Sequence, residues 1–227
     1  MPHSLLLADA QTAADFLTFA GRAARIADEG IRLQAAGGVL RMSAATLAPQ
    51  GLLDATPTVI GMRILASDPE LVCDITVPAE SLQRDPGNEA AITLPATALN
   101  PAWTGVAPPQ SGWEHVGTVT AEHLSALAAH GISIVAGRVP TGTGEEIVRS
   151  VRASVWGPLD DTLFDAPRGV AFTADALGLI SSRRPAEEAA VFRVGRWTRF
   201  STPGGHVLSR GPARVGLTDV RRTGAVV

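Results

Sequence analysis

The chain has 227 residues, of which 45% are hydrophobic, and a formal net charge of −3 at pH 7. All nineteen basic side chains are arginines and there is no tyrosine, which excludes lysine Schiff bases, P-loop or kinase-type lysines and a phenolic acid–base residue. The single cysteine, Cys73, excludes an intramolecular disulfide and a cysteine-based zinc site.

Charge is unevenly distributed along the chain. Residues 181–227 carry nine arginines against three acids, a formal +6, whereas residues 1–180 sum to −9. A polarised chain of this kind can attract an anion, a nucleic-acid backbone or an acidic partner at its basic end. Arginine-rich composition without lysine is also typical of a high-GC bacterium, so the choice of arginine alone does not indicate bidentate recognition.

No apolar run approaches the ~20 residues that a membrane-spanning helix requires. The first nine residues lack a basic segment, and Asp9 interrupts their short apolar stretch, so they do not resemble a signal peptide. We therefore expect a cytoplasmic protein.

The N-terminal elements can be read from periodicity. A capping box at Thr12 to Asp15 predicts a helix with its apolar side chains at helical spacing, and Gly30 should end it. Residues 31–35 alternate, and Gly37-Gly38 predicts a two-residue hairpin. In that register Leu33 faces Met42, Ala35 faces Leu40, and Gln34 lies opposite Arg41 on the solvent side.

A second hairpin is predicted from residues 58–66 and 71–77, with its turn at Asp68-Pro69. Cys73 lies among branched residues and is expected to be a buried strand residue. Residues 100–113 are rich in Pro and Gly and mark a boundary, which predicts two closely packed halves, 1–107 and 108–227. Because Trp103 and Trp113 flank this segment, we expect it to be packed down.

In the second half, residues 120–130 predict a short helix that Gly131 ends, and residues 132–136 predict a strand. The segments Gly30 to Ala35 and Gly131 to Ala136 share a sequence pattern that indicates a degenerate duplication. Thr143 to Glu146 form a capping box before a helix that Gly157-Pro158 stops. A further short helix should run from about 170 to 180.

Residues 189–210 predict a three-stranded meander with turns at 195–196 and 203–204. Its register puts one set of side chains on one face (Phe192, Val194, Trp197, Arg199, Leu208 and Arg210) and Val191, Phe200 and Val207 on the other. The fold class is therefore α+β, with an N-terminal helix and antiparallel hairpins, then short C-terminal helices and the meander.

Residues 12–82 resemble one unit of the DNA sliding-clamp family. The resemblance rests on the order helix, Gly30-Ile31-Arg32-Leu33 strand, Gly37-Gly38 hairpin, and a second hairpin ending in Val77-Pro78-Ala79. It implies a clamp-like topology in this half. A clamp-like helix would need basic residues facing DNA, and here Arg22 and Arg25 are opposed by Asp15, Asp28 and Glu29.

From Thr120 onward, the predicted order helix, strand, helix, helix and basic hairpin is similar to a winged-helix DNA-binding module. Its would-be recognition helix, residues 170–180, carries Asp175 and no arginine, so it cannot make the usual bidentate contact to guanine.

The candidate site is the basic meander, because alternating cations beside an aromatic ring can hold a phosphate or stack a base. Its residues are Arg193, Arg196, Trp197, Arg199 and Arg210. The alternative is an ordinary sheet whose arginines cover Trp197 and Phe192.

The sequence spacing of other candidate residues does not favour a metal site or a phosphate site. His115, His123 and His130 lack the i, i+4 spacing of a helical metal site, and Asp160, Asp161 and Asp165 lack a calcium-loop pattern. Gly142 and Gly144 precede a helix, but Glu145 and Glu146 occupy an anion's place. We expect no metal, no cofactor and no catalytic residue.

The sequence thus favours a non-enzymatic binding protein whose basic C-terminal region contacts an acidic partner, or the acidic half of a second copy in a homodimer. Two alternatives stay open. One is a nucleic-acid-binding protein. The other is a small hydrolase without a cofactor, with Ser or Asp near His115, His123 or His206.

Overall fold

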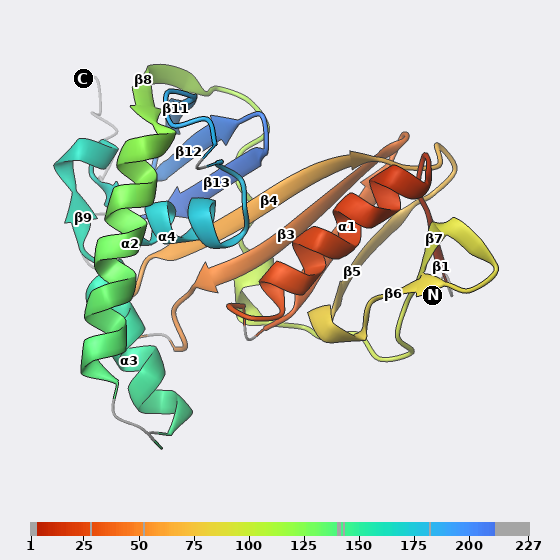
Figure 1. The fold of residues 1–227 in the computed structure, drawn as a ribbon, viewed down its shortest axis with the longest axis horizontal. Helices are drawn as coiled ribbons and strands as arrows, with labels where there is room; N and C mark the ends of the chain where they lie inside the picture. The colour runs from red at the N-terminus through yellow and green to blue at the C-terminus, as the bar shows by residue number, and fades with distance from the viewer. Residues whose placement is uncertain are drawn as a thin grey trace, which may run out of the picture.

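The computed structural model describes residues 4–27, 29–51, 53–139, 142, 144–181 and 183–211. Its centre is one antiparallel sheet of eight strands in the order β5-β2-β3-β4-β13-β12-β11-β8 (Figure 1). The N-terminal strands are β2 (Ile31–Ala36), β3 (Val39–Leu47), β4 (Thr58–Ala66) and β5 (Cys73–Val77). The C-terminal ones are β8 (Glu114–Thr120), β11 (Glu188–Val194), β12 (Trp197–Thr202) and β13 (Gly205–Arg210).

Helices cover one face of this sheet, which we call the helical face (Figure 1). Helix α1 (Ala10–Ala23) lies over the N-terminal strands, and α4 (Gly169–Ala176) lies over β4 and β13. Helices α2 (Ala121–Arg138) and α3 (Glu145–Trp156) pack outside α4 and extend past the sheet. No helix in the described residues is both long and apolar enough to cross a bilayer.

A smaller sheet packs beside α1 (Figure 1). It has the order β1-β7-β6, from β1 (Ser4–Leu6), β7 (Asn88–Thr93) and β6 (Gln83–Asp85). Leu5 and Ile92 of this sheet are fully buried with Phe16 of α1. Short elements complete the chain: η1 (Ala79–Ser81), η2 (Ala102–Gly105), β9 (Leu159–Asp160), η3 (Asp161–Leu163) and β10 (Ala166–Pro167).

Helix α1 begins earlier than its sequence predicts. Asp9, not Thr12, is the N-cap, because its carboxylate accepts the Thr12 backbone N–H at 2.7 Å. The predicted apolar stripe is confirmed, since Phe16, Phe19 and Ala23 are buried against the sheet.

The first hairpin has the predicted register. Leu33 pairs with Met42, Ala35 with Leu40 and Gln34 with Arg41. Leu33, Leu40 and Met42 are fully buried on the helical face, as a core-facing set should be.

The predicted second hairpin is wrong. Strands β4 and β5 form where expected, but β4 pairs with β3 and β13, whereas β5 returns to pair with β2. The four N-terminal strands thus follow the order 5-2-3-4 of a Greek key. A turn sequence at Asp68-Pro69 specifies a change of direction but not which strand the next one will join.

The predicted break at Gly131 is also wrong. Helix α2 runs through Gly131 for 18 residues, so the expected strand at 132–136, the duplication and the winged-helix order all fail. Gly131 is buried because the Trp156 ring of α3 lies directly over it, where a Cβ would overlap the indole. Glycine serves close helix packing here. The N-cap Thr120 is as expected, since its hydroxyl accepts from the His123 N–H.

Helices α3 and α4 form close to their predicted positions. Glu145 and Glu146 occupy the first turn of α3; Thr143 of the predicted capping box lies outside the described residues. Helix α4 is buried at Val170, Ala171 and Thr173, so it cannot enter a DNA groove as a recognition helix.

The meander has its predicted turns and faces. Val191, Phe200 and Val207 pair across β11, β12 and β13 and are buried under the helices. The opposite face, which we call the outer face, carries a smaller apolar cluster that joins both halves of the chain. Its buried members are Ala45, Ile60, Met62, Trp103, Trp197 and Leu208. The connecting segment is packed down through Trp103, as expected.

Candidate functional site

Arg199 is central to the predicted basic site, and it is packed between aromatic rings. Its guanidinium lies 4.6 Å from the ring centroids of both Trp113 and Phe192 on the outer face. Burial lowers the pKa of Arg199, and its Nε has no hydrogen-bond partner among the described atoms. A cation held between two rings covers them and is not positioned as a free phosphate ligand.

The other predicted site residues make separate contacts and do not all lie on the same face of the sheet. Arg193 points to the helical side and donates to the Phe164 carbonyl, and Arg196 donates to the Gly211 carbonyl. Trp197 is buried in the outer cluster, with Arg210 paired opposite on β13. The structure therefore brings together Trp197, Arg199 and Arg210 on one face, but it places Arg193 on the other.

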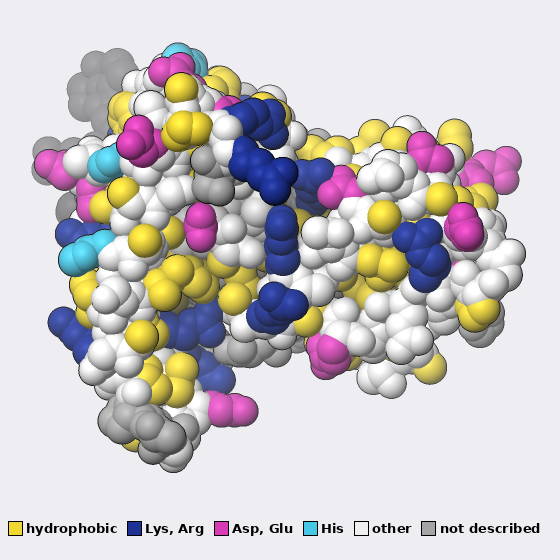
Figure 2. All heavy atoms as spheres, in the orientation of Figure 1, with side chains coloured by type: hydrophobic (Ala, Val, Ile, Leu, Met, Phe, Trp, Pro, Cys, Tyr) yellow, Lys and Arg dark blue, Asp and Glu magenta, His cyan; other side chains and the backbone are white. Residues whose placement is uncertain are grey.

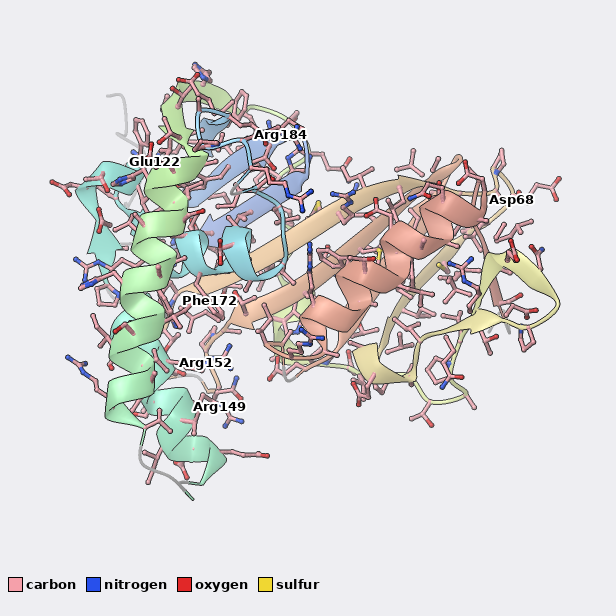
Figure 3. All side chains as sticks on the ribbon, in the orientation of Figure 1. Asp68, Glu122, Arg149, Arg152, Phe172 and Arg184 are labelled. Atoms are coloured by element: carbon pink, nitrogen blue, oxygen red, sulfur yellow. The ribbon has the colours of Figure 1, made fainter. Side chains whose placement is uncertain are left out.

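A different group of arginines gathers on the helical face. Figure 2 shows arginine side chains in a row between α1 and the C-terminal helices. Figure 3 places Arg184 toward the upper end of this region and Arg149 and Arg152, on α3, at the lower end. We define the arginine row by contacts and position as Arg22, Arg63, Arg149, Arg152 and Arg184.

The middle of the row connects the two halves of the chain. Arg22, on α1, donates to the Leu177 carbonyl after α4 at 3.0 Å. Arg63, on β4, pairs with Asp15 of α1 and donates to the Gly204 carbonyl in the β12–β13 turn. A carbonyl fixes a guanidinium without cancelling its charge, so Arg22 stays a positioned cation.

The lower end of the row borders a cavity of about 350 Å³ between α3, the segment that follows α1, and the end of β3 with the residues after it. Arg152 donates to the Ile26 carbonyl at 2.7 Å and lies 5.8 Å from the Phe172 ring centroid. Arg149 lines the cavity together with Glu29, Asp54 and Glu146. The mixture of signs gives the cavity less positive character than the row above it.

The histidines and acids singled out from the sequence lie apart. His115 packs edge-on against Phe192, and His123 hydrogen-bonds to Thr162 at 2.8 Å. Asp160 is buried, but hydrogen bonds from Thr162 and Arg168 outweigh that burial and lower its pKa. Within the described residues, no three His, Cys, Asp or Glu side chains are grouped as metal ligands.

One Ser–His pair is present. His206 Nδ1 lies 3.0 Å from Ser201 Oγ on the outer face, and burial, with the charge of Arg199, lowers the pKa of His206. Neither residue lines the cavity beside α3 or the smaller one described below. The hydrolase hypothesis therefore has a hydrogen-bonded pair, but neither of the two cavities described in this structure lies beside it.

Cys73 is half-buried on β5, with Sγ 3.8 Å from the Leu33 carbonyl oxygen. Burial raises the pKa of its thiol, which is the opposite of what a reactive thiolate requires.

Sequence reasoning missed the arginine row because its members come from four separate parts of the chain, namely α1, β4, α3 and the segment after α4. The i, i+3 spacing of Arg149 and Arg152 was a local signal, and Asp15 seemed to oppose Arg22. In the fold, Asp15 is neutralised by Arg63, 48 residues away.

Comparison with known proteins gives a likeness of fold. A DNA polymerase sliding clamp from Caulobacter crescentus is 14% identical, with a TM-score of 0.47, covering 96% of this chain and 67% of that one. The DNA polymerase III subunit beta from Pseudomonas aeruginosa is 12% identical, with a TM-score of 0.48, covering 100% of this chain and 68% of that one. The weak architectural resemblance to sliding clamps is confirmed, and it concerns architecture alone.

Two family models match consecutive parts of the chain. Residues 1–105 match a domain of unknown function (DUF8010), and residues 108–214 match a second domain of unknown function (DUF8185). No curated protein matches the sequence.

Proposed function

We propose that this chain is a non-enzymatic binding protein that holds a nucleic-acid backbone against the arginine row on its helical face. The observation that carries the proposal is the row itself, in which cations from α1, β4, α3 and the segment after α4 lie along one face (Figure 2). A series of fixed cations suits a polymer with regularly spaced negative charges.

Several row members keep their charge available. Arg22 is held by a carbonyl, and Arg149 is exposed without an ion pair in the described part of the chain. Arg63 and Arg184 are partly offset by Asp15 and Glu187. Arg22, in the middle of the row, and Arg149, on α3, should therefore contribute phosphate contacts.

An acidic protein surface is the second candidate partner, and a different observation favours it. The projecting helices α2 and α3 expose the apolar side chains Ile132 and Ile147 at 43% and 55%. A basic row beside exposed apolar residues also suits a protein interface. The acidic partner could be the N-terminal half of a second copy, and Arg184 would then supply part of the basic C-terminal contact.

Salt dependence tests the first proposal. Binding of a generic fluorescent DNA duplex should weaken steeply with salt, because each phosphate contact contributes roughly −0.9 to the log–log slope. The double variant Arg22→Gln/Arg149→Gln should bind more weakly and reduce the magnitude of that slope by up to about 2. Fluorescence anisotropy across a sodium chloride series measures both.

The charge-matched control is Arg41→Gln/Arg210→Gln, which removes two arginines from the outer face and should leave DNA affinity almost unchanged. Equal losses in both double variants would mean that only net charge matters. Absence of binding at low salt would reject nucleic acid and leave the acidic protein partner.

A further inference from the structure

A second, smaller cavity of about 100 Å³ lies on the outer face, under the segment that connects the two halves. Its floor is sheet, with Ile60, Met62 and Leu208, and its cover is the segment from Trp103 to Gln110. Arg32 holds this cover in place by donating to the Thr104 carbonyl at 2.8 Å. One water needs roughly 10–15 Å³ of such space, so the cavity has room for a small molecule.

Trp103 supplies an unused donor at this cavity. The residue is only 5% exposed, and its indole Nε1 has no hydrogen-bond partner among the described atoms. A buried indole N–H without a partner costs free energy, since water is lost and nothing replaces it. An acceptor bound in the cavity would remove that cost.

The polar lining supplies mainly donors. It consists of Arg32, Gln34, Arg41, Ser43 and Gln110, and no carboxylate lines the cavity. Asp74 forms a bidentate pair with Arg32, at 2.7 and 2.8 Å, and Gln34 also donates to it. The Arg32 guanidinium lowers the pKa of Asp74, so the pair is ionised and neutral in sum at pH 7.

Arg41 is therefore the cation that remains. It is exposed on β3, and it forms no salt bridge with a described carboxylate. One unpaired positive charge matches a monoanion better than a dianion such as phosphate. The floor of Ile60, Met62 and Leu208 matches an apolar portion of the same ligand.

From these features we infer that this cavity binds a small monocarboxylate with a short apolar chain. The carboxylate accepts from the Trp103 indole N–H and lies near Arg41, and the chain contacts the apolar floor. This site is on the opposite side of the sheet from the arginine row, so it is independent of the proposed nucleic-acid contact.

The test is a titration of isotope-labelled protein with sodium butyrate at constant ionic strength. The indole N–H resonance of Trp103, assigned by its loss in Trp103→Phe, should shift saturably. Arg41→Gln should weaken butyrate binding by about tenfold or more, since it removes the charge partner. Arg210→Gln, on the same face but outside the cavity lining, should bind as the parent does.

Trp103→Phe keeps an aromatic ring but removes the donor and part of the buried ring volume, so it should fold with somewhat lower stability and should also weaken binding, as read from the Met62 methyl resonance. Two further ligands decide which chemical class of ligand the cavity binds. Butyramide, which is neutral, should not saturate the site, and inorganic phosphate should bind more weakly than butyrate.

Three results would overturn the assignment. An unshifted Trp103 indole would leave a cavity that holds water alone. Equal binding of butyramide would make it an apolar site, and stronger binding of phosphate would make it an inorganic anion site.

Discussion

Arg199 shows how position decides what an arginine does in this chain. Its pairing with Phe192 on β11 and Leu208 on β13 was predictable from alternation, and both pairs form. The contact with Trp113 was not predictable, because the path of the connecting segment over the sheet has no local pattern. The sequence therefore predicts on which face of the sheet Arg199 lies, but not that its guanidinium is held between two aromatic rings.

We expect Arg199→Ala to lower the free energy of unfolding by about 1–2 kcal/mol, since it removes a guanidinium stacked on two rings. DNA affinity should not change, because the side chain faces away from the arginine row. Chemical denaturation and anisotropy measure the two effects.

Arg210→Ala is the matched control, with the same truncation on a paired strand and no stacking contact in the described structure. It should cost less stability than Arg199→Ala. If Arg199→Ala left stability unchanged and abolished DNA binding, the outer face would replace the helical face as the binding surface.

Among the helices and strands, α2 shows where local sequence pattern fails to predict secondary structure. Gly131 followed by Ile132, Ile134 and Val135 favours a strand by propensity, and single glycines often end helices. Packing against Trp156 overrides both preferences. The order of the strands could not be predicted for a similar reason, because the pairing of β5 with β2 depends on contacts across the whole sheet and not on the local turn sequence.

Two glycines of α2 allow this explanation to be tested within one helix. Gly131→Ala gains up to about 1 kcal/mol of helix propensity, but its methyl group overlaps the Trp156 ring, so we expect net destabilisation. Gly137→Ala meets no atom within 4 Å, so it should stabilise the protein. Thermal unfolding of both variants measures the difference.

A stabilising effect of Gly131→Ala equal to that of Gly137→Ala would contradict the close packing of α2 on α3. Gly131 would then only lower the helix propensity of α2, without being required for packing.

The whole molecule is joined by the pairing of β4 with β13. Five residue pairs, from His206–Met62 to Arg210–Thr58, make one sheet out of the two predicted halves, whose boundary near residue 107 stays a prediction. The buried clusters on both faces also draw side chains from each half. Closely packed halves could be expected from the sequence, but a shared sheet could not.

We therefore expect a single cooperative unfolding transition, because neither half can keep its strand edge and core without the other. Calorimetry should give equal calorimetric and van't Hoff enthalpies. Two separate transitions, or a native-like fold of residues 1–107 alone by circular dichroism and NMR, would show that the shared sheet is dispensable.

The β4–β13 pairing also has a consequence for synthesis on the ribosome. Met62 pairs with His206, which is translated 144 residues later. At about 5–20 residues per second, the nascent β4 waits roughly 7–30 s for its partner strand. During that interval the strand edge and the side chains of Ile60 and Met62 are open to other chains. The speed of translation between these two strands should therefore influence how much of the newly made chain reaches the folded state.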